Sequence, residues 1–583
     1  MATDRRTFLT HCGIAGASLS MHAVGVPRRS NRHFSTSLVY SPAASIEPGD
    51  PPDAASMRAL GARAVEAAIA AGAAYADVRL THQLIETVGT QPNVASAGER
   101  SQEERIRIER ELVYRSGPLA RTFSLTVGIG VRAFFNGYWG FASSPYWSAD
   151  DAAWLGQEAA GEAKTNAAVG LPRDAQLGVV PIVRNGEYRQ AGIDPFTVPT
   201  DEKVYTFQTL LEMVYQDDRN MNVRIVGHRS VNWSYRGTRE QRVFVSSEGT
   251  STAQLRFTTG VGDLEVYGAS TARHRFGKSW EELRNPDFFK RMPQLIAEAK
   301  QRNVERTESV AQAKPVDVGR YDIVFGNGTT AALLYETLGA ATELDRALGF
   351  EANAGGTSFL GPDPLEWLGS PVCSPLVNVT ANRDAVNGAA TVKWDDEGIE
   401  THTFPLIRNG ILVDYQTTRE QAGWLRSYYQ KTEQPVRSHA CASSASALDV
   451  PIQTIPNLTL EPGAHDILED DLIRDTKRGI YFWSGSIEVD QQRRNGSLRY
   501  NPRFPPREII NGRLGATIQN VGILFNSTEL WKKKLIALGG ARSAGEGDLL
   551  QTKGQPEQQA SATIRAVPMK VTQMTVYDVT RKG

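Results

Sequence analysis

The sequence predicts an α+β protein with two folded domains, a mixed α/β domain at residues 51–315 and a β-rich domain at residues 316–583. Amphipathic helical stretches alternate with strand-like stretches in the first half. Short segments rich in β-forming residues and bounded by Gly, Asn or Pro fill the second half. The two textures meet at a Pro-containing stretch, residues 313–316. A length of 583 residues agrees with about two to four domains.

Composition excludes several functional classes. The chain has 64 Lys and Arg against 65 Asp and Glu, a net charge of -1 that gives no electrostatic reason to bind nucleic acid or an anionic membrane. Its three cysteines are too few and too scattered for a disulfide framework or a thiolate zinc cluster. The balanced charge leads us to expect no nucleic-acid partner. Charged residues recur along the body of the chain, so we also expect no membrane span.

Residues 1–50 resemble an export signal followed by a linker. Arg5 and Arg6 precede an apolar dipeptide, and a weakly apolar run rich in Ala, Gly and Ser covers residues 12–26. This layout is typical of a bacterial twin-arginine signal and predicts a periplasmic or otherwise exported protein. Asp4 and His22 depart from the usual pattern. The alternative is a basic N-terminus that is not an export signal.

The first domain is predicted from periodicity. Apolar residues at helical spacing indicate a helix at 57–70, and alternation indicates a strand at 76–80. Two further strands, 125–134 and 138–141, are joined by Asn136-Gly137, a strong turn signal. The charged stretch 99–116 is expected to be a solvated helix or hairpin arm. Other helices are expected at 150–168, 207–221 and 290–306, and other strands at 242–246 and 253–257.

The second domain is expected to consist mostly of short strands. These are predicted at 321–325, 390–394, 404–407, 411–415, 479–482 and 516–524. The dipeptide Asn409-Gly410 indicates a hairpin between two of them.

One helix in this domain suggests chemistry. It is expected at residues 331–347, with Thr329 or Thr330 as its N-cap. Glu336, Glu343 and Asp345 interrupt its apolar sequence, and the two glutamates, seven residues apart, would share one face. Such acids ordinarily form the solvated side of a helix.

Many short stretches occur in the order found in a known family. They are 57–77, 130–132, 139–142, 193–196, 342–353, 356–359, 395–398, 458–463 and 553–556. On these matches the chain resembles the TldD/PmbA metallopeptidases, also called TldD/TldE or "modulator of DNA gyrase" proteins, and is most similar to the exported, long TldD-like branch. The resemblance implies a two-domain TldD/PmbA-like fold in which the β-rich domain carries the HExxxH helix.

The resemblance also implies a zinc site, whose ligands are replaced in this chain. In active members two histidines of HExxxH and a C-terminal cysteine hold zinc, and the motif's glutamate is the general base. Here Tyr335 and Ala340 stand at the histidine positions and Gln551 at the cysteine position, while Glu336 remains at the base position. Zinc lowers the pKa of bound water from 15.7 to about 7, so without it Glu336 faces ordinary water. We therefore expect no metal and no cofactor.

No other histidine replaces the ligands by its spacing. The histidines of the body, each interpreted as a surface or hydrogen-bonded structural residue, are His82, His228, His274, His402, His439 and His465. Cys373 and Cys441 would supply at most one soft ligand, which does not complete a tetrahedral site.

Three hypotheses remain. The first is a non-catalytic subunit that forms a hetero- or homodimer with a TldD/PmbA homologue and holds an unfolded peptide, with Gly355, Gly356 and Thr357 as a candidate contact or a plain turn. The second is an active metallopeptidase in which Glu336, Glu343 and Asp345 hold a harder ion such as Mg²⁺ or Mn²⁺. The third is a stand-alone binding protein. Whether the chain is an enzyme is left open, with loss of peptidase activity as the expectation.

Overall fold

The fold is described from a computed structural model. It describes residues 36–39, 50–89, 120–171, 177–203, 205–206, 209, 234–261, 265–266, 269–270, 280–287, 289–291, 293–294, 310–502 and 504–581. The twin-arginine stretch and the charged stretch 99–116 lie outside these residues, as does most of the helices expected at 207–221 and 290–306.

The first sheet has seven strands and confirms the strands predicted in the first half. Its order is β1 (Thr36–Val39), β3 (Ala120–Phe135), β2 (Tyr75–Gly89), β6 (Ser234–Ser246), β7 (Ser251–Val261) and β5 (Gly186–Arg189), and β4 (Tyr138–Ser144) also pairs with β3. All pairs are antiparallel except β5 with β7. Asn136 and Gly137 both have positive φ in the turn between β3 and β4, as the Asn-Gly signal predicts. Strand β1 lies in the stretch expected to be a linker.

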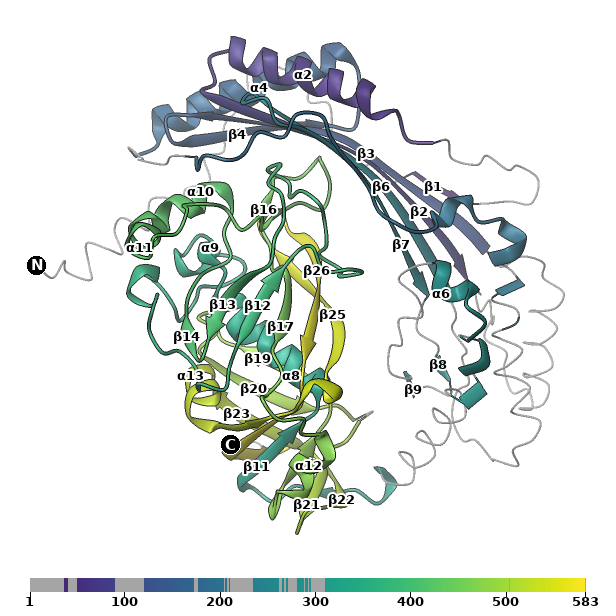
Figure 1. Ribbon diagram of the computed structural model, residues 1–583, viewed down its shortest axis with the longest axis vertical. Coiled ribbons are helices and arrows are strands. Elements are labelled where there is room, and N and C mark those ends of the chain that lie inside the picture. The colour runs from purple at the N-terminus through teal and green to yellow at the C-terminus, as the bar shows by residue number, and fades with distance from the viewer. Residues whose placement is uncertain are drawn as a thin grey trace, which may run out of the picture. The chain divides into compact units, whose positions relative to one another are not determined.

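Two helices lie side by side against this sheet (Figure 1). They are α2 (Ala54–Ala70) and α4 (Ala149–Val169), both close to their predicted bounds. Asp53 and Ser148 accept hydrogen bonds from the first-turn amides and so begin the helices. Their alanine-rich faces are buried, with Ala64, Ala68, Ala152, Ala159, Ala160 and Ala163 fully covered. Small side chains let two helices and a sheet approach closely.

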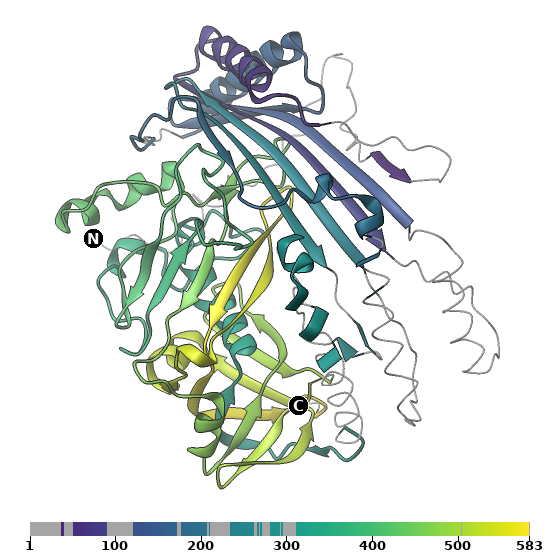
Figure 2. The ribbon, with the colours of Figure 1, turned by 45° about the vertical axis from the view of Figure 1, so that its right-hand side comes forward.

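Two further sheets build the second half (Figure 2). The larger has the order β10 (Lys314–Pro315), β22 (Arg513–Gln519), β21 (Arg507–Ile510), β18 (Arg478–Phe482), β11 (Gly319–Phe325), β27 (Met569–Asp578), β23 (Val521–Asn526), β20 (Asn495–Tyr500) and β19 (Gly485–Val489), and β24 (Leu535–Leu538) pairs with β27. The smaller has the order β14 (Ile411–Leu412), β13 (Phe404–Arg408), β12 (Val379–Asn382), β17 (Asn457–Leu460), β26 (Gln558–Ala566) and β25 (Gly545–Lys553).

The remaining elements are short. Two-stranded pairs are β15 (Ala442–Ser443) with β16 (Ile452–Gln453) and β8 (Glu265–Val266) with β9 (Ala269–Ser270). Short α-helices are α6 (Trp280–Arg284), α9 (Leu344–Ala347), α10 (Arg419–Ala422), α11 (Arg426–Lys431), α12 (Glu469–Arg474) and α13 (Ser527–Glu529). Other helical turns are η1 (Pro195–Thr197), η3 (Pro364–Glu366), η4 (Gly423–Leu425), η5 (Leu530–Lys534) and η6 (Ala541–Ser543).

Three strand predictions for the second half need correction. The expected strand at 390–394 is absent from the described chain apart from one isolated bridge at Trp394, because Asp395 turns the chain back by accepting bonds from two following amides. The stretch 516–524 is two strands separated at Asn520, whose positive φ breaks the extended run. The strand expected at 411–415 ends at Leu412.

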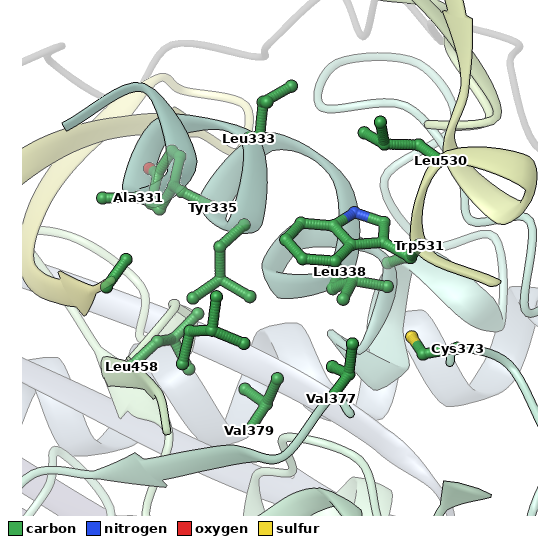
Figure 3. Close-up of a cluster of buried hydrophobic side chains, with 14 of the residues drawn as sticks. Ala331, Leu333, Tyr335, Leu338, Cys373, Val377, Val379, Leu458, Leu530 and Trp531 are labelled. Atoms are coloured by element: carbon green, nitrogen blue, oxygen red, sulfur yellow. The ribbon is translucent and has the colours of Figure 1, made fainter. Parts of the chain in front are cut away.

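A helix packs between the two sheets of the second half. Helix α8 (Asn327–Leu334) contacts β25 and β26 of the smaller sheet and β11 and β19 of the larger. The π-helical turn η2 (Tyr335–Gly339) continues it. Figure 3 shows Leu338 beside Trp531 within the apolar cluster that covers this helix, and Trp531 donates its indole hydrogen bond to Thr337 at 2.9 Å. The chemistry-bearing helix is therefore buried, and the solvated helix face considered from the sequence is wrong.

A loop of the second half binds the first sheet through buried charges. Asp396 forms an ion pair with Arg242, and Glu397 lies 3.3 Å from Nη1 of Arg132. Arg79 lies 3.7 Å from Asp396 and donates to Ser444 Oγ at 2.5 Å. These five charged residues, 79, 132, 242, 396 and 397, are called the clasp cluster below.

Among the described residues, no helix is both long enough and apolar enough to cross a membrane.

Candidate functional site

The helix that carries the retained glutamate does not continue to Glu343. It begins at Asn327, with Gly326 as N-cap, so Thr329 and Thr330 are helical residues rather than the predicted caps. After η2 the helix ends, and Glu343 has extended backbone angles of φ -69 and ψ 118 before α9 begins. Glu336 and Glu343 therefore do not share a helix face. The π-helical turn and the break aim the two carboxylates differently, and π turns recur at functional sites.

Glu343 is the centre of a buried ion network. Its Oε1 accepts from Lys553 Nζ at 2.7 Å and its Oε2 from Arg346 Nε at 2.5 Å. The same ammonium lies 2.6 Å from Asp345 Oδ2. Burial alone would raise the pKa of Glu343, but the charges of Lys553 and Arg346 outweigh it and lower that pKa. Burial raises the pKa of Asp345 to about 6, although Lys553 opposes the shift.

Ala340 and Gln551, at two of the three substituted ligand positions, have no titratable group, and each side chain packs or forms hydrogen bonds within the protein. Ala340 is 3% exposed and lies in the apolar core. Gln551 of β25 donates from Nε2 to Glu343 Oε1 at 2.9 Å and accepts from the Ile455 amide at 3.0 Å. Both ends of the glutamine side chain are therefore used within the protein.

Tyr335 contributes a buried phenol. The residue is 5% exposed, and its hydroxyl has no hydrogen-bond partner among the described residues. Burial, followed by the negative charge of Glu343, raises its pKa above the ordinary value for tyrosine. The phenol therefore stays protonated at neutral pH and is a donor rather than an anionic ligand.

Glu336, at the general-base position, is paired with an arginine from another element. Arg493, in the turn between β19 and β20, donates from Nη1 to Glu336 Oε2 at 2.8 Å and from Nη2 to the Gly355 carbonyl at 2.9 Å. Burial raises the pKa of Glu336, with the Arg493 charge acting against it. Residues 336, 343, 345, 346, 493 and 553 are called the site cluster below.

The candidate peptide contact lies beside this cluster. The Gly356 amide donates to the Glu351 carbonyl at 2.9 Å, and the Thr357 amide donates to the Gln491 carbonyl at 2.6 Å. The Gly355 carbonyl accepts from Arg493. Three backbone groups of this segment are thus used inside the protein, and the assignment as a peptide contact stays a prediction.

The chemistry of these residues does not fit zinc. A tetrahedral zinc site needs imidazole, thiolate or carboxylate ligands. Tyr335 is protonated, Ala340 has no donor atom, and the Gln551 amide oxygen already accepts a hydrogen bond. In the part of the chain that the structure describes, no group of three or more His, Cys, Asp or Glu is arranged to hold a metal ion.

Two histidines that are far apart in the sequence meet in space. His402 Nε2 lies 3.0 Å from His439 Nδ1, and His439 Nε2 lies 2.8 Å from Asp414 Oδ2. Burial and the neighbouring His439 lower the pKa of His402 to about 4. Both histidines are hydrogen-bonded residues, as expected.

Sequence reasoning missed three residues of the site. Arg346 and Lys553 lie inside stretches that carry the family resemblance, but nothing in those stretches says that they pair with Glu343. Arg493 is 157 residues from its partner Glu336 and stands in a turn rich in charged residues, which gives no signal in a single sequence.

Comparison with known proteins agrees with this architecture. Residues 318–576 match the family model of the PmbA/TldA metallopeptidase C-terminal domain. A metalloprotease of Methanothermobacter thermautotrophicus is 27% identical over 409 residues, 70% of this chain and 80% of the relative. One of Methanocaldococcus jannaschii is 25% identical over 68% of this chain and 79% of the relative. The TldD homologue of Haemophilus influenzae is 24% identical over 63% of this chain and 71% of that protein.

A solved structure shares the fold. TldE from Thermococcus kodakarensis superposes with a TM-score of 0.57 at 14% identity, covering 89% of this chain and 99% of that one. The two-domain α+β class predicted from the sequence is confirmed. Fold and sequence matches together define a metallopeptidase-like protein. These matches support assignment of the chain to the TldD/PmbA family.

Proposed function

We propose that this chain is a non-catalytic, peptide-binding member of its family and works as a subunit of a heteromeric peptidase. One observation carries the proposal. At the positions that match the zinc ligands, the chain has a protonated buried phenol, a methyl group and an amide that is already hydrogen-bonded. None of these activates water.

The charges around the site support the absence of a metal. Lys553 bridges Glu343 and Asp345 at 2.7 and 2.6 Å, where it compensates both carboxylates. Arg346 and Arg493 supply two more positive charges. A divalent cation would have to enter next to these groups, and repulsion between like charges is strong where water is excluded.

The same pairs weigh against an active site built on Mg²⁺ or Mn²⁺. Such a site needs free carboxylate oxygens. Glu336 is paired with Arg493, and Glu343 accepts from Lys553, Arg346 and Gln551. Metal binding by these acids would first require the protein to break its own buried ion pairs.

An open strand edge supports peptide binding. Strand β25, which carries Gln551 and Lys553, ends the six-stranded sheet and pairs only with β26 among the described strands. An extended peptide gains main-chain hydrogen bonds by adding to such an edge, and this mode needs no metal. The exposed Leu550 lies on this strand and offers an apolar contact.

Family membership and the N-terminal sequence suggest partner and location. A TldD/PmbA homologue, as a hetero- or homodimer, is the proposed partner, because a chain without zinc ligands needs a catalytic one to take part in proteolysis. Arg5 and Arg6 suggest export by the twin-arginine route, which carries folded proteins.

Metal and activity measurements on the full chain test the proposal. The protein is purified alone and with a co-expressed homologue that has an intact HExxxH motif, and zinc is counted by mass spectrometry. We expect no stoichiometric zinc in this chain, binding of an unstructured peptide, and hydrolysis only in the presence of the homologue. A triple variant, Tyr335→His with Ala340→His and Gln551→Cys, tests whether the restored ligands bind zinc.

Two results on metal and activity would contradict the proposal, and so would failure to bind peptide. The first is stoichiometric zinc in the chain purified alone. The second is peptide hydrolysis by the isolated chain that disappears in Glu336→Ala but persists in the matched Glu529→Ala, which changes an exposed glutamate. Failure to bind any peptide would favour a stand-alone structural role.

A further inference from the structure

Three buried donor groups in and beside the site cluster are unpaired. They are the Tyr335 hydroxyl, Nη1 of Arg346 and Nε of Arg493, none of which has an acceptor among the described residues. Tyr335 is 5% exposed and Arg346 is 2% exposed. Folded proteins leave few buried donors unpaired, so three in one site indicate capacity to bind an acceptor.

The two guanidinium groups flank the same backbone residue. Arg493 donates to the Gly355 carbonyl, and a Cβ placed on Gly355 would lie 2.6 Å from Nη1 of Arg346. Glycine at 355 therefore lets Arg346 approach the backbone. Burial, followed by the charge of Arg346, lowers the pKa of Arg493, as expected for two like charges held near each other.

Both arginines are anchored independently of any ligand. Arg346 is held through Nε by Glu343. Arg493 is held by Glu336, and its own carbonyl accepts from Ser527 Oγ at 2.6 Å. The two elements, α9 and the β19–β20 turn, thus present rigid donors, and a preorganised site loses less entropy on binding.

The unpaired groups fit a carboxylate. Each arginine has one unpaired nitrogen donor, so a carboxylate would accept one charge-assisted hydrogen bond from each arginine and a neutral hydrogen bond from the phenol. A phosphate dianion fits less well, because carboxylates lie close by on four residues: Glu336, Glu343, Asp345 and Glu351. A singly charged, planar acceptor is the better match.

We propose that Arg346, Arg493 and Tyr335 form a subsite for a carboxylate of the bound peptide, an inference that rests on the proposed peptide-binding function. The carboxylate is either the C-terminus of the peptide or an Asp or Glu side chain. In this assignment the site that matches the family's zinc position selects peptides that present a carboxylate.

Three forms of one unstructured peptide test the subsite and its source. They are the free acid, the C-terminal amide, and the amide with one internal Gln replaced by Glu, each with an N-terminal dye. Binding to the full chain is followed by fluorescence anisotropy. We expect the free acid to bind about 10- to 100-fold more tightly than the amide, the ratio expected for charge-assisted hydrogen bonds. Tighter binding of the Glu peptide alone would assign the subsite to a side chain.

Variants assign the effect to the named residues. Arg493→Gln should reduce the affinity for the acid toward that for the amide, and Arg493→Lys, which keeps the charge but loses the unpaired Nε donor, should lie between. The matched control is Arg542→Gln, an exposed arginine paired with Asp466. Thermal unfolding of each variant checks that the fold is retained.

The outcomes separate this inference from the proposed function. Equal affinity for all three peptides overturns the carboxylate subsite and leaves peptide binding standing. A preference for carboxylate that survives Arg493→Gln overturns the assignment to these residues. Binding of no peptide overturns both.

Discussion

Two buried clusters of ion pairs, the clasp cluster and the site cluster, contain the same types of charged side chain but differ in how fully their hydrogen-bond donors are paired. In the clasp cluster, Arg132 donates from Nε and Nη2 to Asp77 and from Nη1 to Glu397. In the site cluster, Arg346 donates from Nε to Glu343, while its Nη1 has no acceptor among the described residues. Both arginines are more than nine-tenths buried.

The difference separates a structural network from one with spare binding capacity. Apart from Nε of Arg79, the side-chain donors of the three clasp arginines are paired. Burial alone would raise the pKa of Asp396, but Arg242 and Arg79 lower it to about 2. Asp345 in the site cluster keeps a pKa raised by burial to about 6. The clasp arginines leave one buried donor unpaired, whereas the site cluster leaves Nη1 of Arg346 and Nε of Arg493 unpaired beside the unpaired Tyr335 hydroxyl.

Breaking the clasp cluster should have the largest effect. Asp396→Asn removes the carboxylate that Arg79 faces and leaves Arg242 paired with Glu240 alone, so the free energy of unfolding at pH 7 should fall by about 3–5 kcal/mol. Urea titration followed by tryptophan fluorescence measures it. Asp384→Asn, which changes an exposed carboxylate, is the control. A loss no larger than that of the control would contradict the structural role.

Removing the ammonium of the site cluster should cost somewhat less. Lys553→Met should lower the free energy of unfolding by about 2–4 kcal/mol at pH 8, because Arg346 still compensates Glu343. The loss should be smaller at pH 5, where Asp345, with its pKa raised to about 6, is mostly protonated in the folded protein. The control is Lys533→Met, at an exposed lysine. A loss independent of pH would argue against the Asp345 pair.

The adjacent residues Asp395 and Asp396 should contribute to the free energy of unfolding with opposite dependence on pH. Burial, with the charge of Glu397, raises the pKa of Asp395 to about 8. The folded state therefore keeps a proton that the unfolded chain releases near pH ~3.9, and the contribution of Asp395 to the free energy of unfolding should fall as pH rises from ~4 to ~8, by at most about 1.4 kcal/mol per pH unit. Asp395→Asn should flatten this dependence. The Asp396 contribution should instead be lost as pH falls from ~4 toward about 2. Unfolding titrations at each pH check both signs.

Surface pairs should matter least. Lys393 and Glu400 are 40% and 57% exposed at their side chains. Lys393→Gln should change the free energy of unfolding by no more than about 0.5 kcal/mol, because water screens the pair. A loss comparable to that of Lys553→Met would remove the distinction between buried and exposed pairs.

Periodicity and turn chemistry predicted much of the first sheet. The helices at 57–70 and 150–168 and the Asn136-Gly137 turn are confirmed, because helix spacing and positive φ are local properties. Local pattern did not predict where the helix expected at 331–347 ends. Its break at Glu343 comes from pairing with Gln416, a contact between distant segments that no local pattern contains. The strand expected at 390–394 failed for a related reason, since Asp395 bonds its own backbone there.

Side-chain identity is a property of single positions, and the sequence therefore determined by itself that a phenol, a methyl and an amide stand at 335, 340 and 551. Only the tertiary structure decided what surrounds them. The fold carries Lys553 from β25 and Arg493 from the β19–β20 turn to acids more than 150 residues away. Electrostatic pairing depends on distance in space, and sequence separation does not report it.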